Sequence, residues 1–287
     1  METLKLIVLA LVQALTEFLP VSSSGHLVLA KSALDIESKG VLLELLLHAG
    51  TLGSVCVYYR KRLWKLVSGV FRLEWVSIRY ALYMLLSMVP VGLLYVCGGN
   101  RISEVYETSG VVCWLMVLNG LFLLSTGLFE RRWRRQAEGR GAISEESAME
   151  AAPAEGGLSV WRVLAMGIGQ AIAVLPGISR SGTSISAGRF AGLNSRIAAE
   201  FSFVMSIPVI AGAALLEFLK ALEAAQEMNE PLAGGYSGLE LLSGMAISFV
   251  AGYLALALLI RMIGRGRLWV FGVYCVVVGL LAAFVGI

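Results

Sequence analysis

The chain reads QALTEFLPVSSSGH over residues 13–26, a polar stretch inside an otherwise apolar sequence. A second polar stretch, QAIAVLPGISRSGT, covers residues 170–183. Aligning their first residues superposes Gln13 on Gln170, Ser22 on Ser179, Ser24 on Ser181 and Gly25 on Gly182. At the mismatches, Ser23 is replaced by Arg180 and His26 by Thr183. The first copy, which also carries Glu17, therefore offers groups that could attack a phosphate, and the second offers a guanidinium that could hold one.

Composition places the chain in a membrane. Of its 287 residues, 57% are hydrophobic and only 15% are charged, and the mean hydropathy is +0.79. A soluble domain has about 25% charged residues. The net charge of +3 comes from basic residues in loops, so it indicates topology. No basic stripe is visible that would bind nucleic acid, and the four cysteines form no CxxC pair that would indicate a disulfide or zinc framework.

Apolar stretches of about 20 residues predict membrane-spanning helices. Six stretches qualify: 41–59, 80–98, 110–129, 199–219, 238–260 and 268–287. Two further apolar regions, 4–33 and 160–193, are each broken in the middle by one of the polar stretches. Their halves are too short to cross about 30 Å of hydrocarbon at about 1.5 Å per residue. We therefore expect each region to be a pair of short helices.

Basic loops give the predicted orientation. Lys and Arg gather directly after the first, third and fifth spans, at 60–65, 131–135 and 261–267, and such loops are cytoplasmic. Each broken region must then start and end on one side of the membrane, as a re-entrant hairpin that is buried in protein or lines a wet cavity. One hairpin and three spans per half predict an all-α integral membrane protein built as an inverted-topology repeat.

This topology divides the chain into repeat 1 at 1–130, a cytoplasmic linker at 131–157 and repeat 2 at 158–287. Repeat 1 holds the hairpin 4–33 and the first three spans. Repeat 2 holds the hairpin 160–193 and the last three. Both termini are predicted to lie outside, in a multi-pass protein of the cell (inner or plasma) membrane.

The polar stretches also predict where the chemistry lies. Gln13 and Glu17 share one helix face, and the serines after Pro20 are good N-cap residues for a second helix. The N–H groups at the start of such a helix bind anions, and the fork of Arg180 suits phosphate oxygens. A charge at membrane depth costs at least ~2.5–3.5 kcal/mol, which makes Glu17, His26 and Arg180 candidates for function.

Structural readings stay open for the same residues. Glu17 and Arg180 could form a buried ion pair that joins the two halves, and any single serine could serve only as a helix cap. Glu44 and His48 are four residues apart within a span. They could relay protons, or they could be a polar pair in the core.

The two stretches resemble the signatures of the undecaprenyl-diphosphate phosphatase family, also known as the bacitracin-resistance family. Its first signature, [Glu/Gln]-x-x-x-Glu followed by Pro-Val-Ser-Ser-[Ser/Thr]-Gly-His, matches Gln13 to His26. Its second, Pro-Gly-x-Ser-Arg-Ser-x-x-Thr, matches Pro176 to Ser184, where Ser184 replaces the final Thr. Gln13 in place of Glu removes one carboxylate that could bind a metal. The resemblance implies the re-entrant inverted repeat and a membrane hydrolase that removes the terminal phosphate of a C55 polyprenyl diphosphate, giving the lipid carrier of cell-wall synthesis.

We therefore expect the diphosphate in a polar pocket open to the outer face. The catalytic candidates are Glu17, Ser23, His26 and Arg180. The candidate phosphate-binding residues are Gln13, Ser22, Ser24, Gly25, Ser179, Ser181, Gly182, Thr183 and Ser184. In this hypothesis Ser23 attacks the terminal phosphorus and Glu17 or His26 takes its proton. The sequence leaves open whether His26 or a metal-bound water attacks instead.

A divalent cation, Mg²⁺ or Ca²⁺, would fit as a charge neutraliser bound by Glu17 and substrate oxygens, and no organic cofactor is expected. The expected partners are the polyprenyl diphosphate lipid and the bilayer, and a homodimer is compatible with the sequence. The alternative function is a transporter or flippase of an anionic polyprenyl lipid, because inverted repeats with broken helices are also transporter architecture.

Overall fold

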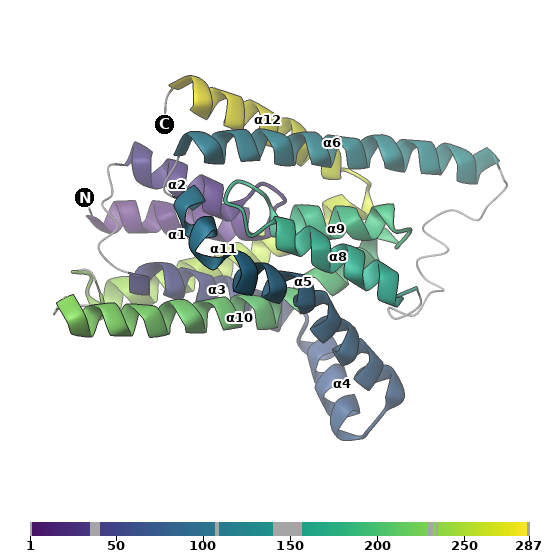
Figure 1. Cartoon of the computed structure of the whole chain (residues 1–287), viewed down its shortest axis with the longest axis horizontal. Helices are drawn as coiled ribbons and strands as arrows, with labels where there is room; N and C mark the ends of the chain where they lie inside the picture. The colour runs from purple at the N-terminus through teal and green to yellow at the C-terminus, as the bar shows by residue number, and fades with distance from the viewer. Residues whose placement is uncertain are drawn as a thin grey trace.

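The protein is entirely helical wherever its structure is described. The computed structural model describes residues 2–34, 41–106, 109–139, 157–228, 232–233 and 235–285, and no strand occurs in these ranges. The helices are α1 (Glu2–Phe18), α2 (Ser23–Ala33), α3 (Val41–Tyr58), α4 (Arg60–Phe71), α5 (Trp75–Tyr106), α6 (Ser109–Gly139), α8 (Val160–Ile172), α9 (Arg180–Phe190), α10 (Ser195–Met228), α11 (Gly238–Gly264) and α12 (Leu268–Val285) (Figure 1).

Five of these helices are long and apolar enough to cross a membrane. The spans are Trp75–Cys97, Gly110–Phe129, Ser195–Glu223, Gly238–Gly264 and Leu268–Val285. α3 and α4 are long and apolar enough for a sixth span only when they are taken together, and the two helices are bent by 77° relative to each other. The prediction of an all-α, multi-pass integral membrane protein is confirmed.

The two polar stretches break helices as predicted. α1 ends at Phe18 and α2 begins at Ser23, with Pro20 in the turn between them. α8 ends at Ile172 and α9 begins at Arg180. The two helices of each hairpin pack against each other. At 11 to 13 residues, α2, α8 and α9 are too short to span the hydrocarbon layer.

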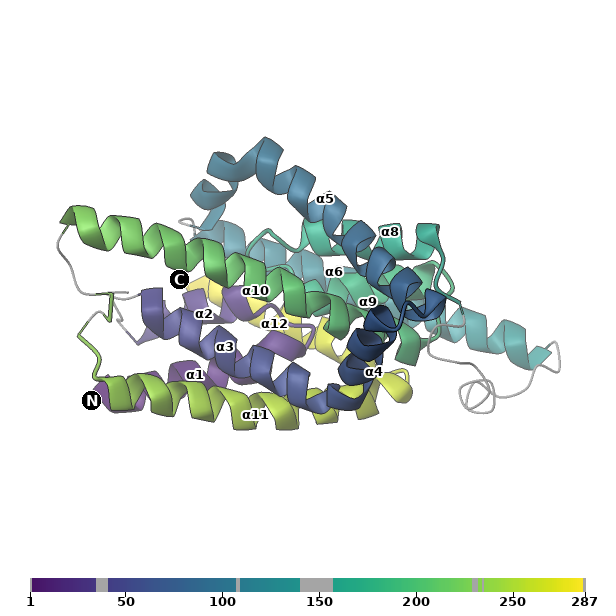
Figure 2. The same ribbon diagram turned by 90° about the horizontal axis from the view of Figure 1, so that it is seen from below.

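The halves run in opposite directions and interlock. α6 ends at the right of Figure 1, whereas its counterpart α12 ends at the left, where α1 begins. The first helix of each hairpin packs on the middle span of the other half, α1 on α11 and α8 on α5, while α6 packs along α12 (Figures 1 and 2). Each hairpin is therefore held partly by the half to which it does not belong.

The predicted linker is partly helical. α6 continues through the arginine-rich segment after the span and ends at Gly139. Residues 131–139 of the predicted linker 131–157 are therefore helical, residues 140–156 lie outside the described ranges, and the linker itself stays a prediction. The repeat boundaries at 130 and 158 stay predictions.

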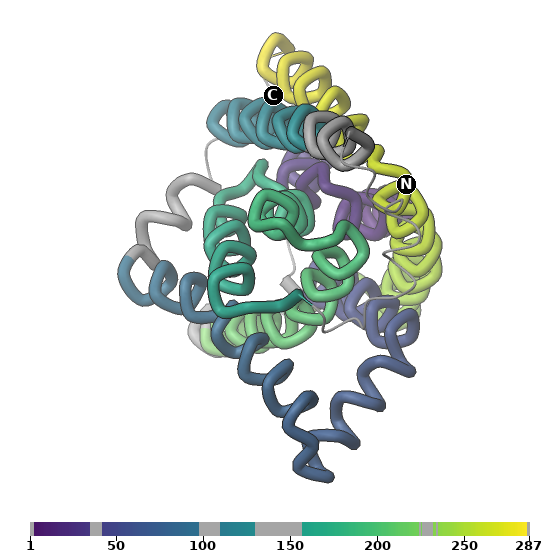
Figure 3. Tube along the Cα trace, turned by 90° about the vertical axis from the view of Figure 1, so that its right-hand side faces the viewer, coloured from purple at the N-terminus to yellow at the C-terminus, as the bar shows by residue number. Residues whose placement is uncertain are grey.

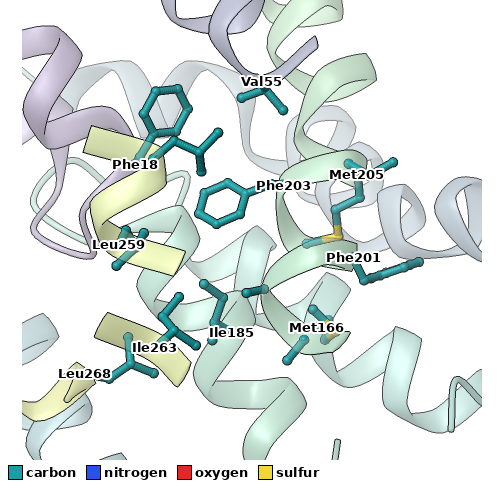
Figure 4. Packing of buried hydrophobic residues seen from close by; sticks show 14 of the residues in the cluster. Phe18, Val55, Met166, Ile185, Phe201, Phe203, Met205, Leu259, Ile263 and Leu268 are labelled. Carbon is teal, nitrogen blue, oxygen red and sulfur yellow. The ribbon is translucent and has the colours of Figure 1, made fainter. Parts of the chain in front are cut away.

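A shared apolar core lies beside the helix breaks. Phe18, at the end of α1, packs edge-on against Phe203 of α10, with ring centroids 6.0 Å apart. Ile185 of α9 and Leu259 of α11 lie in the same cluster (Figure 4). Because this core contains residues from both hairpins and both halves, it fixes the positions of the two breaks relative to each other.

Candidate active site

Glu17 is the centre of the site. The residue is 9% exposed, and its carboxylate accepts hydrogen bonds from three side chains. Arg180 Nη2 donates to Oε1 over 2.9 Å, and Gln13 Nε2 and Ser23 Oγ donate to Oε2 over 3.0 and 2.7 Å. The three donors come from the end of α1 and the beginnings of α2 and α9. The buried ion pair of Glu17 and Arg180 therefore lies together with Ser23, another of the predicted catalytic residues.

The turn before α2 aims Ser23 at Glu17. Ser22, the N-cap residue, has φ of 72°, a left-handed conformation that is uncommon for residues other than glycine. Its Oγ accepts hydrogen bonds from the N–H of Gly25 and, across the repeat, from the N–H of Gly177. The contact with Gly177 ties the first break to the second, so the strained turn is held from both sides.

The turn before α9 is held in the same way. Ser179 caps this helix, its Oγ accepting from the Gly182 N–H over 3.1 Å, and the next residue, Arg180, begins it. Ser181 Oγ donates to the Phe18 carbonyl over 2.8 Å. Each hairpin thus uses one serine to hold the break of the other.

Asn119 of α6 bridges the two breaks from outside the hairpins. Its Nδ2 donates to the Pro20 carbonyl over 3.2 Å, and its Oδ1 accepts from the Ser179 N–H over 3.1 Å. The side chain is 1% exposed. A buried amide that satisfies one group of each turn fixes the distance between them.

Glycines allow the two turns to approach each other. Gly177 has φ of 98°, and a Cβ at this position would lie 2.5 Å from the Val112 carbonyl oxygen. A Cβ on Gly25 would lie 2.9 Å from Met116 Sδ and 3.3 Å from the Gly177 Cα. Side chains at these positions would push the breaks apart, and with them Ser23 and Arg180.

A pocket of about 230 Å³ opens beside these groups. Its polar lining is Glu17, Ser22, Ser23, Ser24, His48, Ser179, Arg180 and Glu217. Its apolar lining is Leu45, Ala173, Ile178, Val209, Ile210, Ala213 and Ala214. Within the part of the chain that the structure describes, buried Nη1 of Arg180 has no hydrogen-bond partner. The pocket lining therefore combines a hydroxyl, a carboxylate and a guanidinium, and one nitrogen of this guanidinium has no hydrogen-bond partner among the described residues.

Several predicted phosphate-binding residues support the turns and do not line the pocket. Gln13 lies behind Glu17, and Gly25 and Gly182 donate their N–H groups to the capping serines. Thr183 Oγ1 donates to the Ser179 carbonyl, and Ser184 Oγ to the Arg180 carbonyl. Ser181 is engaged with Phe18. Of the predicted residues, Glu17, Ser22, Ser23, Ser24, Ser179 and Arg180 line the pocket.

His26 points elsewhere. Its Nδ1 lies 2.8 Å from the Ser22 carbonyl, and its Nε2 lies 2.9 Å from the hydroxyl of Tyr274 on α12. The two rings stack with centroids 5.6 Å apart. His26 is not among the pocket-lining residues. In this structure both ring nitrogens are engaged outside the pocket, so His26 faces α12 and not Glu17.

A different histidine lies near Glu17. His48 Nε2 of α3 is 3.9 Å from Glu17 Oε2, and its Nδ1 is 2.9 Å from the Glu44 carbonyl. The Glu44 side chain pairs with Lys31, so it does not form the predicted pair with the His48 ring. Sequence reasoning also missed Glu217 of α10 and Asn119. Both residues lie on helices outside the two polar stretches, and no local sequence pattern indicates that they lie near the site.

The residues around Glu17 do not form a cation site by themselves. Within the described ranges, no three His, Cys, Asp or Glu side chains gather closely enough to hold a metal ion. Both Glu17 oxygens already accept hydrogen bonds. Mg²⁺ is often bound by one or two carboxylates together with substrate phosphates. A cation would therefore fit here only with oxygens of the substrate.

Fold and site together define a helical membrane protein with a polar pocket, lined by Glu17, Ser23 and Arg180, where two broken helices meet. Comparison with known families gives a match to the family described as Bacitracin resistance protein BacA over residues 6–281. The chain belongs to this family.

Individual relatives extend over nearly the whole chain. A protein of Bacteroides fragilis named undecaprenyl-diphosphatase is 33% identical over 99% of this chain and 98% of its own length. Proteins of the same name from Korarchaeum cryptofilum and Methanobrevibacter smithii are 33% and 32% identical, each over 98% of this chain and over 98% and 96% of their own lengths. These names do not favour the transporter alternative.

Proposed function

We propose that this protein hydrolyses undecaprenyl diphosphate to undecaprenyl phosphate and inorganic phosphate. One observation carries the proposal: Ser23 Oγ donates to Glu17 Oε2 over 2.7 Å in a pocket that Arg180 also lines. A hydroxyl bound to a carboxylate and placed beside a guanidinium has the parts of an activated nucleophile with an electrostatic clamp. Membership of the family and the names of the relatives support the same reaction.

In the proposed first step, Ser23 Oγ attacks the terminal phosphorus while Glu17 accepts the hydroxyl proton. The bond from that phosphorus to the bridging oxygen breaks, and undecaprenyl phosphate leaves with the bridging oxygen. Glu17 gives this proton to the departing phosphate and is ionised again. A water then attacks the phosphoserine and gives its proton to Glu17. Glu17 returns that proton to Ser23 Oγ as the bond between this oxygen and phosphorus breaks, and inorganic phosphate is released. Arg180 binds the phosphate oxygens through its free Nη1 and stabilises their charge in both transition states.

The apolar wall of the pocket suits the lipid tail. Val209, Ile210 and Ala213 of α10 line the pocket together with the polar turns. In the proposed complex the diphosphate lies against Arg180 and Ser23, and the first isoprene units lie along α10. The rest of the C55 tail extends into the bilayer, so the pocket encloses only the reacting end.

We further propose that the pocket faces the outer side of the cell (inner or plasma) membrane, with both termini on that side. The basic loops support this orientation, and α1 begins at the end of the bundle where α12 ends (Figure 1). There the enzyme would recycle the cell-wall lipid carrier and give resistance to bacitracin.

A divalent cation, if used, would be carried by the diphosphate and would contact Glu17 only in the complex. When bound it would neutralise phosphate charge. Purified protein after dialysis should then contain well below one equivalent of Mg²⁺ or Ca²⁺ per chain by elemental analysis. A tightly retained stoichiometric cation would contradict this part of the proposal.

The deciding experiment measures phosphate release from undecaprenyl diphosphate by the purified full-length protein. Ser23→Ala should lower kcat about a thousandfold, because it removes the nucleophile. Ser125→Ala is the matched control, since Ser125 is exposed and its Oγ donates to the Phe122 carbonyl of its own helix. The control should keep the wild-type rate. An inactive wild type would refute the proposed function, whereas an active Ser23→Ala would refute only the role of Ser23.

A further inference from the structure

α4 projects away from the bundle (Figure 1). Figures 1 and 3 show α4 and the start of α5 standing away from the other helices. Because α4 is bent by 77° from α3, it lies nearly in the membrane plane if α3 crosses the bilayer. It does not line the pocket. Its role is therefore separate from the proposed reaction.

One face of α4 packs against protein. Leu66 is buried there, and a Cβ on Gly69 would lie 2.1 Å from the Oγ of Ser77 on α5. Arg62 on the same side pairs with Glu200 of α10 over 2.9 Å, and its guanidinium lies 4.7 Å from the centroid of the Tyr80 ring. These contacts fix the rotation of α4 about its own axis.

The outward surface carries two parallel stripes. The apolar stripe is Trp64, Val67 and Phe71, at i, i+3 and i+7, with exposures of 75, 48 and 84%. The basic stripe beside it is Lys61, Lys65 and Arg72, all exposed. None of these three cations pairs with a carboxylate within the described ranges. Leu73, in the turn before α5, and Trp75, the first residue of α5, are also exposed apolar residues next to this stripe.

We propose that α4 is an interfacial helix that binds anionic phospholipids. Helices with an apolar face of Trp, Phe and aliphatic residues beside a basic face lie at the boundary between headgroups and acyl chains. Here the apolar stripe would enter the acyl region, and the basic stripe would bind phosphate headgroups. The nearly in-plane axis allows both stripes to be used along the whole helix. Charge complementarity selects anionic over zwitterionic lipid.

The first test measures lipid preference with purified protein in detergent. Fluorescent phosphatidylglycerol and phosphatidylcholine are the two probes. The triple variant Lys61→Gln/Lys65→Gln/Arg72→Gln should weaken phosphatidylglycerol binding about fivefold per removed charge, with little effect on phosphatidylcholine. The matched control is Arg261→Gln/Arg265→Gln/Arg267→Gln, which removes three exposed cations near the α11–α12 turn. It should stay within about twofold of wild type.

Equal losses in both triple variants, or none in the α4 variant, would refute a specific lipid site on α4. Because α4 lies outside the pocket, the α4 variant should keep the wild-type rate of phosphate release, which shows that it is folded. This comparison does not require that the substrate be the proposed one, since any measurable phosphatase activity serves.

The second test locates Trp64. The difference between the fluorescence of wild type and of Trp64→Phe gives the Trp64 emission, measured in phosphatidylglycerol nanodiscs with and without brominated acyl chains. We expect blue-shifted emission that the brominated chains quench. Emission typical of water without quenching would overturn the proposal and would instead indicate a surface for a soluble protein partner.

Discussion

Glu17 is the structural partner of Arg180 and, in the proposed reaction, the base for Ser23. It neutralises Arg180 at a buried position and accepts the hydroxyl of Ser23. Removing one partner of a buried ion pair typically costs about 3–5 kcal/mol, because the other charge is left unpaired. Alanine substitutions at Glu17 or Arg180 would therefore mix instability with lost catalysis. Substitutions that keep the charge separate the two roles.

Arg180→Lys is one such substitution. Lysine can still pair with Glu17, so the protein should fold with nearly unchanged thermal stability. It lacks the planar fork that leaves Nη1 free for phosphate while Nη2 binds Glu17. We expect kcat for phosphate release to fall about 100-fold. A fully active Arg180→Lys would mean that Arg180 serves only as the structural partner of Glu17.

His48 gives a second prediction for a single residue. Its Nε2 is 3.9 Å from Glu17 Oε2, whereas the ring of His26 binds Tyr274. His48→Leu should therefore lower kcat about tenfold, which is less than the ~10²–10⁴-fold typical of a general acid or base, because His48 is expected only to assist Glu17. His26→Leu should lower kcat less, provided that both variants have similar melting temperatures. The opposite order of effects, measured by phosphate release, would return His26 to the catalytic group.

At the scale of single residues, the sequence predicted that Glu17, Ser23 and Arg180 would come together, but it did not predict the positions of the two histidines. Glu17, Ser23 and Arg180 stood out because the aligned stretches differ at polar positions that a membrane segment rarely tolerates. The direction of His26 depends on the rotation of α2, which the packing on α6 and α12 decides. His48 approaches from α3, and no pattern within one helix indicates which distant carboxylate it will meet.

The helix breaks are the elements on which the site depends. Ser22, Ser179 and Asn119 satisfy backbone groups that a broken helix exposes at membrane depth. An unsatisfied backbone group in this environment costs several kcal/mol. We therefore expect the turns to tolerate substitutions that keep these hydrogen bonds. Substitutions that alter the distance between the two breaks should be tolerated less well.

Gly177→Ala should destabilise the protein, since it adds a Cβ at φ of 98° within 2.5 Å of a carbonyl oxygen. We expect a clear fall in melting temperature, in line with the ~1–3 kcal/mol typical of such strain. Gly212→Ala is the control, because Gly212 lies in α10 with no atom within 4 Å of an added Cβ. Thermal unfolding in detergent should show no loss for the control, and equal melting temperatures would contradict the close approach.

The helices that could be predicted are those for which the length of the apolar stretch and the position of its polar residues indicated the same structure. The hairpins could be predicted, since each apolar half is too short to span and the break contains Pro or Gly with serines. α4 was missed because its basic residues read as a loop after the first span. Its apolar residues, spaced at i, i+3 and i+7, become meaningful only once the bend after Tyr58 makes it a separate helix.

For the whole molecule, the orientation in the membrane is a prediction that labelling can test. Leu239, exposed at the start of α11, is predicted outside, and Lys61 on α4 is predicted inside. In a background with exposed Cys97 changed to Ser, Leu239→Cys should react with an impermeant maleimide on intact cells, and Lys61→Cys only after permeabilisation. The reverse pattern would place the pocket on the cytoplasmic side. Oligomeric state also stays a prediction, and cross-linking in membranes would test the homodimer.

The interlocking of the halves bears on how the protein is made. α1 leaves the ribosome long before the helix on which it packs, α11, has been synthesised. Until then the first hairpin, with Glu17 and Ser23, must wait beside the membrane insertion machinery with its final partner missing. Arg180 also arrives late, so the carboxylate is left without its counter-charge during most of synthesis. Translation order therefore makes assembly of the reaction centre one of the final events of membrane insertion, and chains truncated before α11 should be substrates for membrane quality-control proteases.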